Sequence, residues 1–278
     1  MSMVDFIGLG AQKSGTSWVY ACLFEHPEIC APVKEIHFFS RPRFANGKDW
    51  YEGHFSRCGK EKLKGEFSTS YLYSSEAPER IKSLYPSAKL IAILRDPIDR
   101  AVSQYRNSIK AGEIDEVVTF SAFMEKEKSV LEQGLYAKQL GRYFAEFPRE
   151  QILVLIYEDS KKDPKEFIRS IYRFLGVDEH FLPSMLYHEI NVARNPKFII
   201  LERIMHKIAE GLRRYGLSRL VHFVRQSGLP DLVRSKNTKR SREVVIDRDK
   251  LKDYFRADVL ELSNMLGRDL TSFWKIVT

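Results

Sequence analysis

The chain has 278 residues, enough to bury a sizeable core, and 44% hydrophobic with 29% charged residues is ordinary for a globular protein. Its net charge of +8 favours an anionic ligand, although charge alone does not separate a nucleotide, a sulfated glycan, nucleic acid and a membrane surface. No apolar run approaches membrane-spanning length, so we expect no integral membrane segment.

The first element is a strand, a glycine loop and a helix in direct succession. Val4–Leu9 is an apolar strand candidate, and helical sequence at Ser17–Glu25 follows the loop. This order places backbone N–H groups and a helix N-terminus around one point, which binds phosphate. The glycine spacing matches the Walker pattern, but Thr16 stands where that pattern requires lysine, and the loop's only lysine is Lys13. The sequence therefore predicts a phosphate loop of a different kind.

Further strands and helices alternate along the chain. The expected strands are Lys64–Phe67, Lys89–Leu94 and Gln151–Tyr157, of which the last two are continuously apolar, as in a sheet covered on both faces. The expected helices are Ala77–Leu84, Pro97–Lys110, Phe120–Gln133, Tyr136–Phe147 and a segment from Pro164 to Leu175. The pattern predicts an α/β, P-loop-like three-layer fold with a central parallel sheet flanked by helices.

The last third of the chain lacks strand signals. Helices are expected at Pro196–Tyr215, Leu217–Gln226 and Asp247–Leu266, and the basic segment 234–242 is expected to be a solvated loop because it lacks interleaved aromatic residues. We expect one domain over residues 1–278, with a nucleotide-binding core at 1–190 and a helical extension at 191–278 that caps the ligands. No nucleic-acid partner is expected.

A second anion site is predicted where the third expected strand ends. Arg95 follows that strand, Asp96 is a plausible N-cap of the next helix, and Ser103 lies one to two turns further on. Arginine and serine can hold a phosphate by charge-assisted hydrogen bonds. Alternatively, Arg95 pairs with Asp96 or Asp99. Two anion sites at one sheet edge suit a nucleotide with phosphates at both ends of its ribose.

Several segments together resemble a known family. They are Gly10 to Ser17, Lys34-Glu-Ile-His-Phe-Phe39, Gly65-Glu66, Ser70-Tyr71, Leu94-Arg-Asp-Pro97 through Ser103 and Tyr105, Asp163-Pro164, Phe174-Leu175-Gly176, and Leu266-Gly-Arg-Asp-Leu270 with Trp274. In this order they resemble the sulfotransferases that use 3′-phosphoadenosine 5′-phosphosulfate (PAPS), nearest the heparan sulfate sulfotransferase domains and their bacterial relatives.

The resemblance implies roles for individual residues. The donor's 5′-phosphosulfate is expected at Lys13, Ser14, Gly15, Thr16 and Ser17, with Lys13 neutralising the leaving oxygen. The 3′-phosphate is expected at Arg95 and Ser103, with Arg194 and Lys197 either reaching it or solvated. Glu35 matches the proposed general base and His37 a histidine on the acceptor side. The product is 3′-phosphoadenosine 5′-phosphate (PAP), and no metal is required.

Each of these residues also has a purely structural interpretation. Glu35 could be a surface carboxylate paired with Lys34 or Lys48, and His37 a hydrogen-bonded core residue. Phe67 stands where the heparan sulfate enzymes carry a lysine near the acceptor, so their acceptor recognition is not transferred to this chain. The expected acceptor is a hydroxyl or amine of a glycan or of a small hydroxylated metabolite. The rival hypotheses are a P-loop kinase or other nucleoside triphosphatase, and a non-catalytic protein that binds anionic ligands.

The cysteines bear on the compartment. Cys22, Cys30 and Cys58 make an odd count without a CxxC pair, which predicts neither a disulfide framework nor a zinc site. Together with the absence of a signal-peptide pattern at the N-terminus, this predicts a reducing, cytoplasmic location.

Overall fold

The computed structural model describes residues 4–59, 62–187 and 244–276. The chain divides into two compact units, the larger made of Met1–Gln104, Phe123–Asn191 and Asp247–Thr278, and the smaller of Tyr105–Ala122 and Val192–Ile246. Within the smaller unit, the Tyr105 hydroxyl donates to the Val118 carbonyl at 2.5 Å and its ring packs against Phe120. The expected single domain stays a prediction.

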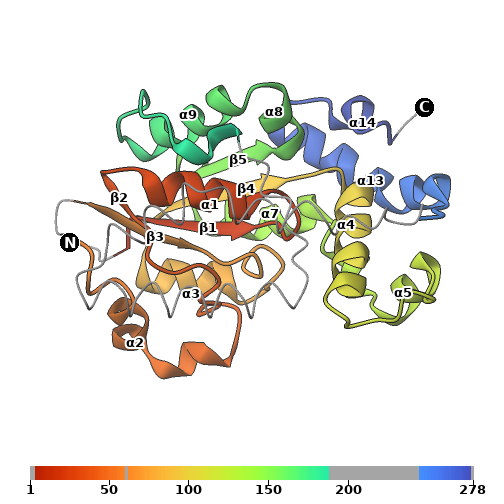
Figure 1. The fold of residues 1–278 in the computed structure, drawn as a ribbon, viewed down its shortest axis with the longest axis horizontal. Helices are drawn as coiled ribbons and strands as arrows, with labels where there is room; N and C mark the ends of the chain where they lie inside the picture. Colours follow the sequence, from red (N-terminus) through yellow and green to blue (C-terminus); the bar gives the residue numbers. More distant parts are fainter. Residues whose placement is uncertain (1–3, 60–61, 188–243, 277–278) are drawn as a thin grey trace, which may run out of the picture. The chain divides into compact units, whose positions relative to one another are not determined.

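A parallel sheet forms the centre of the larger unit, as predicted, and it has five strands where the sequence indicated four. Its strands lie in the order β2-β3-β1-β4-β5 (Figure 1). All four pairings between neighbours are parallel, so every strand ends at the same edge of the sheet. The strands are β1 (Phe6–Gly10), β2 (Ile29–Cys30), β3 (Leu63–Phe67), β4 (Lys89–Leu94) and β5 (Ile152–Ile156).

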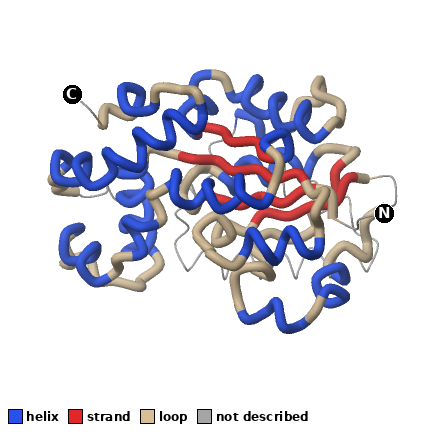
Figure 2. Tube along the Cα trace, turned by 180° about the vertical axis from the view of Figure 1, so that it is seen from behind, coloured by secondary structure: helices blue, strands red, loops and turns tan. Residues whose placement is uncertain are grey.

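Helices follow the strands and cover the sheet, as the tube in Figure 2 also shows. The α-helices in the described residues are α1 (Thr16–Glu25), α2 (Lys48–Gly53), α3 (Ala77–Leu84), α4 (Pro97–Lys110), α5 (Phe120–Lys126), α6 (Ser129–Glu132), α7 (Tyr136–Glu146), α8 (Tyr157–Lys162), α9 (Pro164–Leu175), α13 (Arg248–Leu266) and α14 (Leu270–Phe273). Short 3₁₀ turns lie at Pro42–Asn46, Arg149–Gln151 and Ser184–Tyr187.

The alternation of side chains along the strands builds a core on each face of the sheet. Phe6, Ile91 and Ile93 point to one face, where the apolar sides of α1 and α9 cover them. The residues between them, such as Ile7 and Leu90, are equally buried on the other face. Because both faces are covered, β1 and β5 are apolar throughout and β4 is apolar after Lys89, whereas β3 carries Lys64 and the buried Glu66.

Several elements differ from the sequence prediction, among them the short helices α2, α8 and α14, which were not predicted. The helix expected over Phe120–Gln133 is divided into α5 and α6, and the carbonyl of Val130 in α6 accepts a hydrogen bond from the buried Arg100. The strand expected to reach Tyr157 ends one residue earlier, because α8 begins there. The two-residue edge strand β2 was not predicted, since two residues carry no periodicity.

Of the three helices expected in the last third of the chain, one lies in the described residues. Helix α13 begins at Arg248, with Asp247 as its N-cap, and ends at Leu266 as predicted. The helices expected at Pro196–Tyr215 and Leu217–Gln226, and the basic segment 234–242, lie outside the described residues. They stay predictions.

The cysteine prediction is wrong. Cys30 in β2 and Cys58, just after α2, form a disulfide across 28 positions of sequence, and Cys22 is the free, buried cysteine. An odd count permits one pair with one thiol left over, and only the fold brings the two cysteines together. Disulfides persist mainly in oxidising compartments, so the cysteine argument for a reducing location is lost. The cytoplasmic location stays a prediction.

Candidate functional site

The phosphate loop, residues 10–17, connects the end of β1 to the start of α1. Gly15 precedes the helix in the left-handed conformation, with φ of 79°, and Lys13 has φ of 69°. The first turn of α1 carries no acidic side chain, so nothing there competes with a bound anion. The turn thus brings together the five predicted residues, Lys13, Ser14, Gly15, Thr16 and Ser17.

The buried hydroxyl of Ser14 in this loop indicates a ligand. Ser14 is fully buried, and its Oγ has no hydrogen-bond partner among the described residues. A buried hydroxyl without a partner costs free energy, which an oxygen of a bound anion would recover. A Cβ on Gly15 would lie 2.7 Å from ring carbons of Tyr157, so the ring closes the loop from one side. Sequence reasoning missed Tyr157.

Arg95 lies against the phosphate loop. It follows β4, and its guanidinium donates to the Lys13 carbonyl at 3.1 Å and lies 5.0 Å from the centre of the Tyr157 ring. The carboxylates of Asp96 and Asp99 instead approach the Arg248 guanidinium, at 3.7 and 3.1 Å. These contacts favour the ligand interpretation of Arg95 over pairing with its acidic neighbours.

Helix α4 begins beside Arg95. Asp96 caps it as predicted, accepting the backbone N–H groups of Ile98 and Asp99 at 2.8 and 3.0 Å. Ser103, the second residue predicted for this anion site, is half-buried on the helix. Arg100, three residues before Ser103 on α4, is fully buried and donates to Gln104 and to the Val130 carbonyl. Its role is therefore structural.

Glu35 and His37 lie in the 34–39 turn, which runs beside β3. Both have left-handed backbone angles, with φ of 63° and 56°. The Glu35 carboxylate accepts Lys34 Nζ at 2.6 Å and the Thr69 N–H at 3.0 Å, and lies 3.3 Å from His37 Nε2. The pairing with Lys34 is therefore present, but the carboxylate is also aimed at the end of β3. Lys48 pairs with Glu52 instead.

His37 connects Glu35 to a pair of serines. Its Nδ1 lies 2.7 Å from Ser70 Oγ, which is 2.6 Å from Ser40 Oγ. Burial lowers the pKa of His37, and the nearby cations Arg41, Arg43 and Lys34 lower it further against the opposing charge of Glu35. A neutral imidazole has one donor and one acceptor nitrogen, so His37 can donate to Glu35 and accept from Ser70.

A second segment orients the 34–39 turn. Sequence reasoning did not assign it this role, although Ser70-Tyr71 resembles the family. The segment follows β3 and reads Ser68-Thr69-Ser70-Tyr71. All four side chains form hydrogen bonds with the turn. The hydroxyls of Ser68 and Tyr71 accept the backbone N–H groups of His37 and Phe38. The Thr69 hydroxyl donates to the Glu35 carboxylate, and the Ser70 hydroxyl bonds the His37 ring. A polar run directly after an expected strand, at the ligand edge of a parallel sheet, was the available signal.

Thr69 also joins the two halves of the site. Its carbonyl lies 2.8 Å from the position that a Cβ on Gly10 would take, so only glycine fits at the end of β1. Gly10 has φ of 134°, which also disfavours a side chain. The phosphate loop and the carboxylate of Glu35 are thus anchored on adjacent strand ends.

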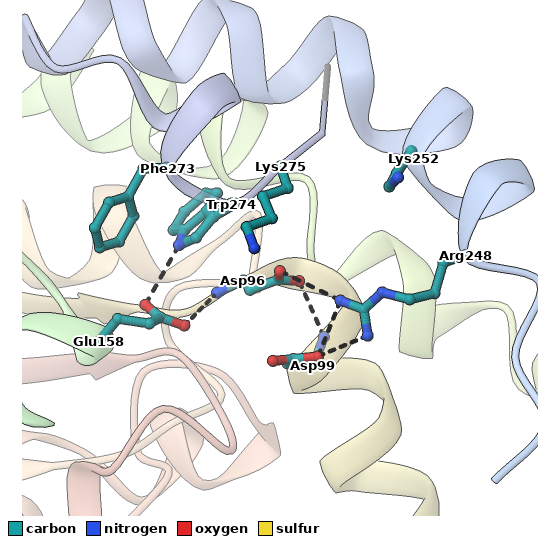
Figure 3. A pocket seen from close by; sticks show the side chains of 8 residues that line it. All are labelled: Asp96, Asp99, Glu158, Arg248, Lys252, Phe273, Trp274 and Lys275. Carbon is teal, nitrogen blue, oxygen red and sulfur yellow. Dashed lines mark hydrogen bonds and ion pairs between the residues drawn. The ribbon is translucent and has the colours of Figure 1, made fainter. Parts of the chain in front are cut away.

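A cavity of about 430 Å³ opens beyond the start of α4. In Figure 3, Asp96 and Asp99 face Arg248 of α13, while Glu158 lies on the other side and accepts the Trp274 ring N–H. Lys252, Phe273 and Lys275 complete the lining. Burial raises the pKa of Asp96 to about 6, against its backbone hydrogen bonds and the nearby Arg248. Three acids and three cations line this cavity, and the ion pairs of Arg248 with Asp96 and Asp99 tie α13 to α4.

The remaining predicted ligand residues, Arg194 and Lys197, lie outside the described residues. Among the residues that are described, no group of three or more histidine, cysteine or acidic side chains could hold a metal ion. In the same part of the chain, no helix combines the length and apolar character needed to cross a membrane.

Comparison with known proteins agrees with this geometry. Residues 4–214 match the family model described as the sulfotransferase domain. The bifunctional heparan sulfate N-deacetylase/N-sulfotransferase 3 of Homo sapiens is 33% identical over 198 residues, covering 63% of this chain and 22% of that protein. The heparan sulfate glucosamine 3-O-sulfotransferase 3B1 of Mus musculus is 34% identical over 185 residues, covering 62% of this chain and 47% of that protein.

A solved structure extends the similarity over almost the whole chain. A sulfotransferase from Alicyclobacillus acidocaldarius superposes with a TM-score of 0.70 and 26% identity, covering 99% of this chain and all of that one. The chain spans less than half the length of the two heparan sulfate relatives. The family match nevertheless covers most of this sequence, and the chain belongs to the sulfotransferase domain family.

Proposed function

We propose that the chain transfers a sulfonyl group from PAPS to a hydroxyl or amine of a glycan or a small hydroxylated metabolite. The observation that carries the proposal is the pairing of a phosphate loop with a carboxylate on adjacent strand ends. Lys13 lies in that loop with the Ser14 hydroxyl, which has no hydrogen-bond partner in the described part of the chain, and Glu35 lies against Thr69. Family membership supports the same chemistry.

In the proposed reaction, the acceptor oxygen or nitrogen attacks the sulfur while the bond from sulfur to the 5′-phosphate oxygen breaks. The electron pair stays on that oxygen, where Lys13 and the N-terminus of α1 stabilise the charge. The acceptor's proton goes to the Glu35 carboxylate, and PAP leaves as the product. Arg95 and Ser103 would bind the 3′-phosphate. Positioning and charge stabilisation then supply most of the rate enhancement.

The surroundings of His37 favour an acceptor that carries negative charge. Lys34, Arg41 and Arg43 all act on its pKa, and Arg41 and Arg43 are exposed to solvent. The two heparan sulfate relatives act on that glycan according to their names, which supports a glycan acceptor here. Phe67 replaces a lysine of that branch and is fully buried, so it offers no charge to an acceptor.

A transfer screen tests the proposal. The protein would be incubated with ³⁵S-labelled PAPS and a panel of heparosan, its N-deacetylated form, desulfated glycans, lipids and small phenols and alcohols. We expect label in at least one acceptor, with equimolar release of PAP. If phosphate from ATP enters an acceptor and sulfate does not, the chain is a kinase and the proposal is wrong. PAP binding without transfer to any member of the panel would favour a binding protein.

A further inference from the structure

The larger unit contains a buried carboxylate that the proposed reaction does not use. Glu66 lies in β3 and is fully buried. Its Oε1 accepts the Tyr71 hydroxyl at 2.5 Å and lies 3.4 Å from the Tyr51 hydroxyl, while its Oε2 accepts the Ser68 hydroxyl at 2.7 Å. Burying a carboxylate is costly, so its retention calls for a specific task.

The two short hydrogen bonds extend from Glu66 to the 34–39 turn. Ser68 Oγ accepts the backbone N–H of His37 at 2.9 Å, and the Tyr71 hydroxyl accepts that of Phe38 at 2.9 Å. A hydroxyl group has one proton, so donating it to Glu66 leaves only lone pairs facing the turn. Both chains of hydrogen bonds therefore run from the turn to Glu66, which accepts at the end of each.

These two amides belong to a strained part of the backbone. Glu35 and His37 both have positive φ, which costs a residue with a side chain free energy unless its surroundings enforce it. In the same turn, the Glu35 N–H donates to the Phe67 carbonyl at 2.8 Å. Three hydrogen bonds to Phe67, Ser68 and Tyr71 thus hold the backbone angles of the turn. These angles direct the Glu35 carboxylate toward Thr69.

We propose that Glu66 is a positioning residue for the reaction, which sets the direction of two hydrogen-bond chains and so holds Glu35 and His37 in their working conformation. The inference rests on the proposed function, because it assigns to Glu66 the geometry of the proposed base. It does not depend on which acceptor is used.

The chemistry of the side chain explains why a carboxylate is needed. Two hydroxyl donors converge on it, and a charged acceptor binds both more strongly than a neutral group would. Burial raises the pKa of Glu66 to about 7, while the bonds from Tyr71 and Ser68 act in the opposite direction and favour the charged form. A glutamine of the same shape has one oxygen and one NH₂ group, so one of the two hydroxyls would lose its acceptor.

The test uses three variants of the network and one control. Glu66→Gln changes the acceptor, while Ser68→Ala and Tyr71→Phe each remove one connecting hydroxyl. Tyr172→Phe is the control, because its hydroxyl donates to the Cys22 carbonyl at 3.2 Å in a buried region outside the network. For each protein we would measure PAP binding by calorimetry and kcat and KM for ³⁵S transfer from PAPS to N-deacetylated heparosan, or to the best acceptor in the screen.

We expect Glu66→Gln to lower kcat by about 100-fold, as misplacement of a catalytic group by about 1 Å does, and each hydroxyl deletion to lower it by about 10-fold. PAP affinity and KM for PAPS should change little, and the control should match the wild type. A crystal structure of Glu66→Gln with PAP should show altered φ at Glu35 or His37.

Three results would overturn the inference. One is a wild-type kcat in Glu66→Gln, the second is an unchanged 34–39 turn in its crystal structure, and the third is loss of PAP binding along with activity, which would indicate a general role in folding. If Glu66→Gln does not fold, a wild-type kcat in both hydroxyl variants is equally decisive. A wild-type protein without sulfonyl transfer would contradict the proposed function instead, and the crystal structures would still test the turn.

Discussion

The phosphate loop and the 34–39 turn face the same sheet edge but are built in different ways. The loop follows from its own sequence, because a strand, two glycines and a helix start fix its path. The turn has no glycine at its two left-handed positions, Glu35 and His37, and takes its shape from side chains of the 66–71 segment. The conformation of the loop is thus determined locally, whereas that of the turn is imposed by side chains 31 to 33 positions away in sequence.

This difference predicts how each region fails. A change inside the loop should affect the nucleotide directly and leave the rest of the protein intact. A change in the segment behind the turn should leave nucleotide binding intact and damage the transfer step. Point substitutions can separate the two kinds of failure, and the largest effect is expected at Lys13.

Replacing Lys13 with alanine should lower kcat by about 10³-fold, because the charge that stabilises the leaving oxygen is lost. The measurement is ³⁵S transfer from PAPS under saturating donor. Lys126→Ala, at the exposed end of α5, serves as a matched control and should retain wild-type activity. Full activity in Lys13→Ala would mean that the loop binds the donor without taking part in the reaction.

Glu35→Gln should lower kcat by about 10²-fold with little change in PAP affinity, since it removes a base and not a phosphate ligand. Glu76→Gln is the control, because Glu76 is an exposed carboxylate paired with Arg80 on α3. Steady-state kinetics and calorimetry on the same samples separate the two effects. A large loss of PAP affinity in Glu35→Gln would show that the turn and the loop are not independent.

The Cys30–Cys58 disulfide closes the stretch of chain that contains the 34–39 turn. Cys58→Ser should lower the free energy of unfolding by roughly 3–4 kcal/mol, the value expected for a loop of this length. Denaturant unfolding of the variant, and of wild type with and without reductant, measures the effect. Transfer should fall more than PAP binding does. Equal stability with and without reductant would contradict a structural role for the bridge.

A further effect on stability concerns pH. Because Glu66 has a pKa of about 7 in the folded protein, above that of an unfolded glutamate, the folded state binds the extra proton between about pH 4.5 and 7. Stability should therefore fall as pH rises through this range, by about 1.4 kcal/mol per unit of pKa difference.

Glu66→Gln should lack this dependence, while Asp96, which has a pKa of about 6, contributes to both proteins and cancels in the comparison. The groups that act on the pKa of Glu66 are Tyr71, Ser68, Glu35 and Tyr51, and all remain in the variant. Parallel pH slopes of unfolding free energy for the two proteins would contradict the assignment to Glu66.

The contrast between the two regions also explains what could be predicted from sequence. The sheet, helix α4 and the cap at Asp96 depend on periodicity and on neighbours within a few residues, and they were predicted closely. The phosphate loop itself was predicted for the same reason. Glu35 and His37 came only from the family resemblance, because nothing local in their sequence distinguishes them from surface residues.

The site contacts and the disulfide that were missed depend on contacts between distant segments. Thr69 reaches Glu35 across 34 positions of sequence, the ring of Tyr157 covers Gly15, and Cys30 reaches Cys58 only once β2 and α2 are in place. A single sequence contains no periodicity that reports such pairs. Tertiary structure is needed to reveal them.

The most direct test of the central claim is calorimetric titration of the wild-type protein with PAP and, separately, with ATP and magnesium. The loop with Lys13 in place of a Walker lysine, and Arg95 beside it, predicts that PAP binds more tightly and that magnesium does not strengthen its binding. Tighter binding of magnesium-ATP than of PAP would contradict a PAPS-dependent sulfotransferase.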